Sequence, residues 1–136
     1  MRRLILLTTF VTAVVVVPVV WAGSPHFVGT PTVTRDGNSL TVSGKEAGLG
    51  NETQVEIQIS VQAACLNPGQ NFPQAANKET FTQTATFPVQ NGKADFTLTV
   101  TATFQPKCSP PMSVVFGDVT VTDLSHGVTT TIAGPF

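Results

Sequence analysis

The sequence has 136 residues, of which 41% are hydrophobic and only 11% are charged. Without residues 1–22 it keeps 114 residues, with five Lys and Arg against eight Asp and Glu, so the net formal charge is about −3. A chain of this length usually forms one domain with one core. Its few, scattered basic residues exclude the cationic surface that nucleic-acid binding needs.

The N-terminal segment predicts a signal peptide. Arg2 and Arg3 precede a run without charge at residues 4–20, and Val20-Trp21-Ala22 then places aliphatic Val20 and small Ala22 where a signal peptidase reads. The alternative is a membrane anchor, but the run is slightly short for a bilayer span and contains Pro18. We therefore expect cleavage after Ala22. The domain of residues 23–136, with no membrane span, is then secreted or retained at the cell envelope.

Period-two alternation of apolar and polar residues predicts an all-β domain. Strands are predicted at residues 31–35, 39–45, 53–65, 113–122 and 127–133, with a bulge near Gly117 in the fourth of these segments. Two further strands form a predicted hairpin around Asn91-Gly92, which supplies the positive φ angles of a type I′ turn. The apolar residues of its arms face each other if Phe87 pairs with Phe96, and rows of Thr then share the outer face. Together these strands predict a seven-stranded antiparallel immunoglobulin-like β-sandwich.

Cys65 and Cys108 predict a disulfide, because an even number of cysteines in an exported chain favours a bridge. Alternating strand directions bring Cys65 to the pole that holds the connection of residues 104–112, so the bridge ties the two longest loops, 66–78 and 104–112. Tied loops at one end of a sandwich are where binding sites tend to lie. The candidate binding surface consists of Asn67, Gln70, Asn71, Phe72, Gln74, Asn77, Lys78, Phe104 and Lys107.

Candidate catalytic and metal-binding residues are few. After residue 22 the histidines are His26, near the new N-terminus, and His126, in a predicted turn at the pole opposite the tied loops. Both are expected to be solvated surface residues, so neither a triad nor a zinc cluster is predicted. The acidic residues are expected on solvent-facing strand positions or in turns, without pairing; they include Glu46, Glu52, Glu56, Asp95, Asp118 and Asp123. The sequence therefore predicts no catalytic residue, no metal ligand and no cofactor.

Four segments carry a resemblance to a known group of proteins. They are Ser43-Gly44-Lys45-Glu46-Ala47-Gly48-Leu49-Gly50, Ala64-Cys65-Leu66-Asn67-Pro68-Gly69-Gln70-Asn71, Asn91-Gly92-Lys93-Ala94-Asp95-Phe96 and Cys108-Ser109-Pro110-Pro111. The chain resembles a group of uncharacterised small secreted bacterial β-sandwich proteins with the same cysteine pair. The general build is also similar to immunoglobulin-like domains and to the enediyne apoproteins. The resemblance implies the fold and export and adds no catalytic residue.

Three classes of function stay open. The favoured one is a secreted or envelope-associated binding module without catalytic activity, whose partner is an extracellular protein, a glycan or a small apolar ligand. The alternatives are a carrier of a small apolar molecule, as the enediyne apoproteins are, and a secreted protease inhibitor that uses the stiff loop around Lys107 and Cys108.

Overall fold

A computed structural model describes residues 24–69 and 77–136, and the predicted signal peptide, residues 1–22, lies outside this part of the chain. The described residues form eight strands and no helix, so no helix among them could cross a membrane. The strands are β1 His26–Phe27, β2 Thr32–Asp36, β3 Ser39–Ala47, β4 Gln54–Leu66, β5 Lys78–Pro88, β6 Ala94–Thr101, β7 Ser113–Asp123 and β8 Val128–Ile132.

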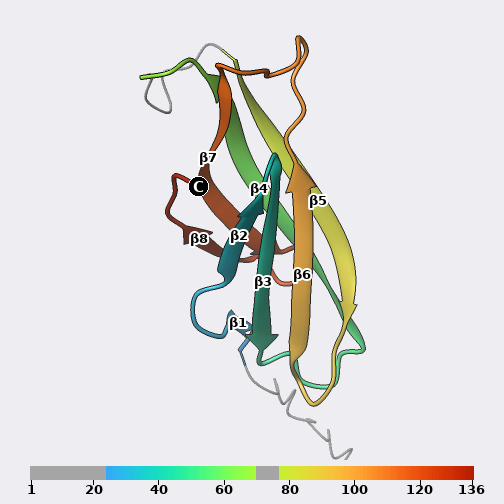
Figure 1. The fold of residues 1–136 in the computed structure, drawn as a ribbon. Helices are drawn as coiled ribbons and strands as arrows, with labels where there is room; N and C mark the ends of the chain where they lie inside the picture. Colours follow the sequence, from blue (N-terminus) through green and yellow to red (C-terminus); the bar gives the residue numbers. More distant parts are fainter. Residues whose placement is uncertain (1–23, 70–76) are drawn as a thin grey trace, which may run out of the picture.

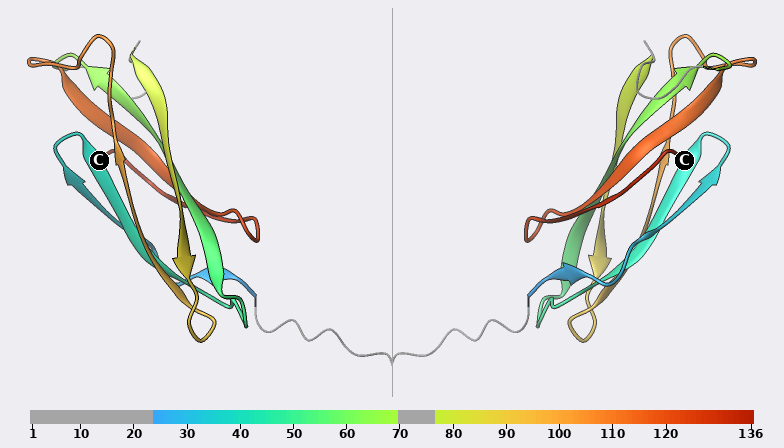
Figure 2. Two further views of the ribbon diagram at one scale, coloured as in Figure 1. Left: turned by 90° about the vertical axis from the view of Figure 1, so that its right-hand side faces the viewer. Right: turned by 90° about the vertical axis from the view of Figure 1, so that its left-hand side faces the viewer.

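The strands form two antiparallel sheets that pack as two layers (Figures 1 and 2). In the first sheet β3 is central, with β6 along one side and the short β1 and β2 along the other. In the second sheet the strand order is β5-β4-β7-β8. The all-β fold predicted from the alternation is thus confirmed. The seven predicted strands correspond to β2 through β8, and the two-residue β1 is an addition.

The predicted bulge in β7 is also confirmed. Val61 of β4 pairs with Val119, whereas Ala63 pairs with Phe116, so two residues of β7 lie opposite the single residue Gln62. Such a bulge moves every later side chain of the strand to the other face. Because of this shift, apolar residues on both sides of the bulge point into the core.

The predicted hairpin is correct at its turn and wrong in its arms. Asn91 and Gly92 both have positive φ, 53° and 73°, and Gln90 pairs with Lys93 as expected. Beyond that bridge the chain separates, since β5 pairs with β4 in one sheet and β6 pairs with β3 in the other. Phe87 and Phe96 do meet, with ring centroids 6.3 Å apart, but across the core rather than as neighbours in one sheet. The predicted single array of Thr is therefore divided between the two sheets.

The core lies between the two sheets and is built from the inward residues of each strand. Its largest fully buried apolar side chains are Phe96, Phe116, Leu40, Ile57 and Ile59. Among the described residues two charged side chains are buried with them, Glu46 and Asp123, each with no exposed surface. Burial of a carboxyl group is costly unless it is neutral or paired, so these two residues mark a special region.

Gly48 directly follows β3 and lies beside Ser24, and we predict that Gly48→Ala is destabilising. Gly48 has φ +76°, and a Cβ there would lie 2.0 Å from the carbonyl oxygen of Ser24. The conformational cost and the backbone clash together should lower the free energy of unfolding by roughly 3 kcal/mol in urea titrations. Gly37→Ala is the control, because Gly37 also has positive φ (+58°) but open space around it. Equal losses of unfolding free energy in both variants would contradict the role of the clash with Ser24.

Candidate functional site

The predicted disulfide is present, and it joins the end of β4 to the connection between β6 and β7. The Cα atoms of Cys65 and Cys108 are 5.8 Å apart, and the Cys65 sulfur also lies 3.8 Å from the sulfur of Met112. We call the surface formed by residues 66–69, 77–78 and 104–112 around this bridge the disulfide pole. A disulfide in a small all-β domain is compatible with an extracellular location.

The disulfide pole brings together the described members of the predicted binding surface. Asn67, Asn77, Lys78 and Lys107 are all exposed. Phe104 differs from the prediction, because its side chain is only 7% exposed and packs edge-on against Phe81 with centroids 5.8 Å apart. Its ring closes the core at this end and offers no surface to a partner. Four further predicted residues lie outside the described part of the chain: Gln70, Asn71, Phe72 and Gln74.

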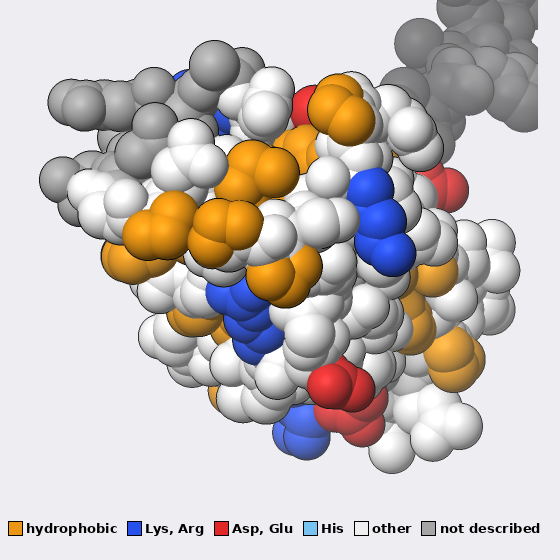
Figure 3. Space-filling view, turned by 45° about the horizontal axis from the view of Figure 1, so that its top comes forward, with side chains coloured by type: hydrophobic (Ala, Val, Ile, Leu, Met, Phe, Trp, Pro, Cys, Tyr) orange, Lys and Arg blue, Asp and Glu red, His pale blue; other side chains and the backbone are white. Residues whose placement is uncertain are grey.

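Apolar side chains gather on this pole, as the orange surface in Figure 3 shows. Pro106, Pro110 and Pro111 are exposed in the loop before β7. On the outer face of the second sheet, half-buried Val115 packs against Ala64 and Leu66, which form a small apolar cluster separate from the main core. Prolines and the disulfide restrict the backbone here, so little conformational entropy is left to lose when a partner binds.

A second group of polar side chains lies at the other end of β4, far from the disulfide, and we call it the acidic cluster. It consists of Glu46 at the end of β3, Glu52 in the loop before β4, Asp123 at the end of β7 and His126 in the turn before β8. Asp123 organises the turn, because one carboxylate oxygen accepts the backbone N–H groups of Ser125 (2.7 Å) and His126 (3.1 Å).

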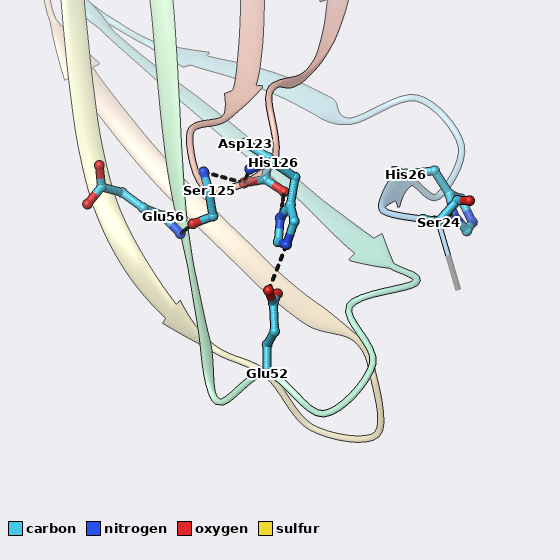
Figure 4. Close-up of polar contacts among 7 residues, drawn as sticks. All are labelled: Ser24, His26, Glu52, Glu56, Asp123, Ser125 and His126. Atoms are coloured by element: carbon cyan, nitrogen blue, oxygen red, sulfur yellow. Dashed lines mark hydrogen bonds and ion pairs between the residues drawn. The ribbon is translucent and has the colours of Figure 1, made fainter. Parts of the chain in front are cut away.

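His126 lies between two carboxyl groups (Figure 4). Its Nδ1 is 2.6 Å from Asp123 Oδ2, and its Nε2 is 2.8 Å from Glu52 Oε1. Burial alone would lower the pKa of His126, but the hydrogen bonds to Asp123 and Glu52 outweigh it, and the pKa is raised. The ring is 21% exposed and Glu52 is 44% exposed, so this pair lies between the buried carboxyl groups and solvent.

Glu46 completes the cluster from the core side. Its side chain has no exposed surface, and neither carboxyl oxygen has a hydrogen-bond partner of normal geometry among the described residues. Burial and the neighbouring carboxyl group of Asp123 raise the pKa of Glu46 to about 8. Glu46 is therefore largely protonated at neutral pH, and the proton relieves the repulsion between two buried carboxyl groups.

Glu46 and Asp123 were predicted on solvent-facing positions, but both are fully buried. His126 was predicted to be solvated, but its ring is held between Asp123 and Glu52. The strand parity held the signal that was missed. Glu46 follows Leu40 and Val42 on the inward face of β3, and Asp123 follows Val121 on the inward face of β7. Alternation alone therefore predicts burial for both carboxyl groups.

The acidic cluster has the chemistry of a proton-sharing or cation-binding site. Both ring nitrogens of His126 are engaged by carboxyl groups, so the ring has no free nitrogen with which to activate a neighbouring hydroxyl. Next to it, a hollow of about 480 Å³ is lined by polar residues that include Asn51, Glu52 and Ser125. The cluster and the hollow together form the second candidate site.

The fold and these two sites define a disulfide-linked β-sandwich with one tied-loop surface and one buried acidic cluster. No family model, no curated protein and no solved structure significantly matches the chain.

Proposed function

We propose that the protein is an exported binding module without catalytic activity, built on an immunoglobulin-like β-sandwich, which contacts a protein partner through the disulfide pole. The observation that carries this proposal is the surface that the disulfide fixes at one end of the sandwich. There the exposed prolines lie beside exposed lysines and next to the small apolar cluster of the second sheet. Stiff loops with an apolar centre and a charged rim are typical of protein-binding surfaces.

The charges of this surface indicate the kind of partner. Residues 66–69, 77–78 and 104–112 contain Lys78 and Lys107 and no acidic residue, although the domain as a whole is acidic. Complementary charges speed association and select among partners. The proposed partner is therefore an extracellular or envelope protein that presents acidic residues around an apolar patch.

The two alternatives draw different support. A protease inhibitor would be a special case of the same surface, because Lys107 is exposed in a loop that the disulfide closes. Two hollows do not support a carrier of an apolar molecule. The one beside the acidic cluster is lined by polar side chains, and a second, around Gly48 and Gly92, is lined by glycines, asparagines and Lys93. Apolar ligands are usually enclosed by hydrophobic side chains.

We predict that Lys78→Glu combined with Lys107→Glu slows association with the partner by roughly tenfold or more, because it reverses both charges of the pole. Labelled protein is added to the producing cells, their isolated envelope and their secreted proteins, and the association rate of each complex is measured. Lys45→Glu with Lys93→Glu is the charge-matched control at the other end of the sandwich.

The proposal is supported if only the pole variant loses association. It is contradicted if wild-type protein binds nothing in the three samples, or if the control loses as much as the pole variant. A bound protease whose activity falls would identify the inhibitor form of the same function.

A further inference from the structure

The acidic cluster places three metal-ligating side chains from three separate elements at one point. One ligand atom each of Glu46, Asp123 and His126 lies within 4.8 Å of the other two. Glu46 comes from β3, Asp123 from the end of β7 and His126 from the turn that follows. The strands on which the two carboxyl groups lie belong to different sheets, so the packing of the whole sandwich holds the three groups together.

The burial of Glu46 is an independent indication that a binding partner for its carboxyl group belongs at this point. It is completely buried, yet neither of its carboxyl oxygens has a hydrogen-bond partner among the described residues. Buried polar atoms in native proteins nearly always have partners, and buried carboxylates are usually paired with a positive charge or coordinate a metal. Its strand parity directs it inward, toward Asp123 and His126.

The imidazole of His126 is already held as it is in many metal sites. Nε2 lies 2.8 Å from Glu52 Oε1, and in the neutral tautomer in which Nε2–H donates to Glu52, the lone pair is on Nδ1, which faces Asp123. A metal-binding histidine typically donates its other ring N–H to a carboxylate, which fixes the tautomer and the ring orientation. Glu52 is therefore a positioning residue and does not reach the same point as Nδ1.

From these observations we propose that Glu46, Asp123 and His126 Nδ1 bind one divalent transition-metal ion of the zinc class, with Glu52 orienting the imidazole. A mixed set of imidazole nitrogen and carboxylate oxygens suits such an ion better than calcium or magnesium, which prefer oxygen ligands alone. The site is separate from the disulfide pole and does not depend on the binding function proposed above.

The ion takes the position between His126 Nδ1 and Asp123 Oδ2, where the metal-free protein holds a proton. These atoms are 2.6 Å apart, whereas two ligands of one zinc ion, each about 2.0–2.2 Å from the metal, lie well over 3 Å from each other. The cluster therefore opens slightly on binding. Access is from the side of Glu52 and the adjacent hollow, because Glu46 and Asp123 are closed off from solvent.

The test is titration of the full chain with Zn²⁺ by calorimetry and with Co²⁺ by visible absorption, after treatment with a chelator. We expect one ion per chain and a Co²⁺ spectrum with nitrogen and oxygen ligands. Glu46→Gln should abolish stoichiometric binding while the variant stays folded, because the amide keeps the shape and removes a buried acid. His126→Gln should have the same effect on binding, and Glu52→Ala should weaken binding by roughly 10–100-fold.

His26→Gln is the matched control, since His26 is an exposed histidine on β1 whose Nδ1 contacts the carbonyl oxygen of Ser24. Binding that survives in His26→Gln and is lost in Glu46→Gln and His126→Gln supports the proposed site. The proposal is overturned if wild-type protein binds neither Zn²⁺ nor Co²⁺ at micromolar concentration. Binding that persists in Glu46→Gln, or that disappears in His26→Gln, overturns it as well.

Discussion

Replacing both cysteines by alanine, Cys65→Ala with Cys108→Ala, is expected to lower the free energy of unfolding by about 4 kcal/mol. The bridge closes a loop with a sequence separation of 43 residues, and in the chain-entropy model a loop of that size restricts the unfolded chain by about this amount. A small domain has a total stability of only about 5–15 kcal/mol, so the loss is a large fraction of it. Alanine is chosen because Cys65 is buried, with 5% of its surface exposed, and a serine hydroxyl there would lack a partner.

Urea unfolding of the oxidised wild type and of the double variant measures this effect. Reduced wild-type protein is the matched control, because it loses the bridge and keeps both sulfur atoms, including the contact with Met112. The reduced protein and the variant should show similar losses. A loss below about 1 kcal/mol in both would contradict the prediction and imply that the unfolded chain is already compact around this pole.

The same variant separates stability from binding. Without the bridge, residues 104–112 are no longer tied to the end of β4, so the exposed prolines and Lys107 lose their fixed position relative to Lys78. Binding through the disulfide pole should weaken even at temperatures where the variant is fully folded, because the loop must be ordered when the partner binds. The acidic cluster lies at the other end of β4 and should keep its structure.

The sequence was sufficient for the strands, the bulge and the bridge because each depends on local or simple topological rules. Alternation around Ile57 and Ile59 specifies an inward and an outward face, and the change of parity at Gly117 requires an extra residue. The bridge followed from two cysteines and from strand direction. None of these predictions depends on which strands are neighbours in a sheet.

The pairing of β5 and β6 could not be predicted from the same rules. Alternation fixes which side chains of a strand are buried, but Phe87 and Phe96 are equally buried whether their strands pair in one sheet or face each other across two. The turn at Asn91-Gly92 is compatible with both arrangements. The choice depends on β3 and β4, which supply the real partners, and this is a property of the whole sandwich.

The acidic cluster was missed for a different reason. Glu46 and Asp123 have inward parity, but an isolated buried carboxyl group is so costly that an acidic residue is reasonably expected in water. Their burial becomes understandable only when His126 and the second carboxyl group are seen beside them. Those contacts join residues from different sheets and from a turn, so the spacing of the residues along the sequence does not predict them.

The stability of the metal-free protein is expected to fall as pH rises from about 4.5 to about 8. The pKa of Glu46 is raised from 4.5 in the unfolded chain to about 8 in the folded one, first by burial and then by Asp123. Between these values the folded protein holds a proton that the unfolded chain has released, so its stabilising effect is complete below the lower pKa and lost through the upper one. The raised pKa of His126 acts with the same sign above its ordinary value of 6.5.

Glu46→Gln should flatten this dependence, because an amide carries no charge at any pH in the range. The variant should match wild-type stability near pH 5 and exceed it by a few kcal/mol near pH 8, where the wild-type protein must bury an ionised carboxylate beside Asp123. Urea unfolding at a series of pH values, with a chelator present throughout, measures both curves. Glu56→Gln, which changes an exposed carboxyl group of β4, is the control and should leave the wild-type curve in place.

The interpretation of Glu46 as the protonated member of the cluster is wrong if the wild type gains stability over this range, or if both variants follow one curve. The slope that remains in Glu46→Gln is expected to come from His126, whose pKa is also raised in the folded protein.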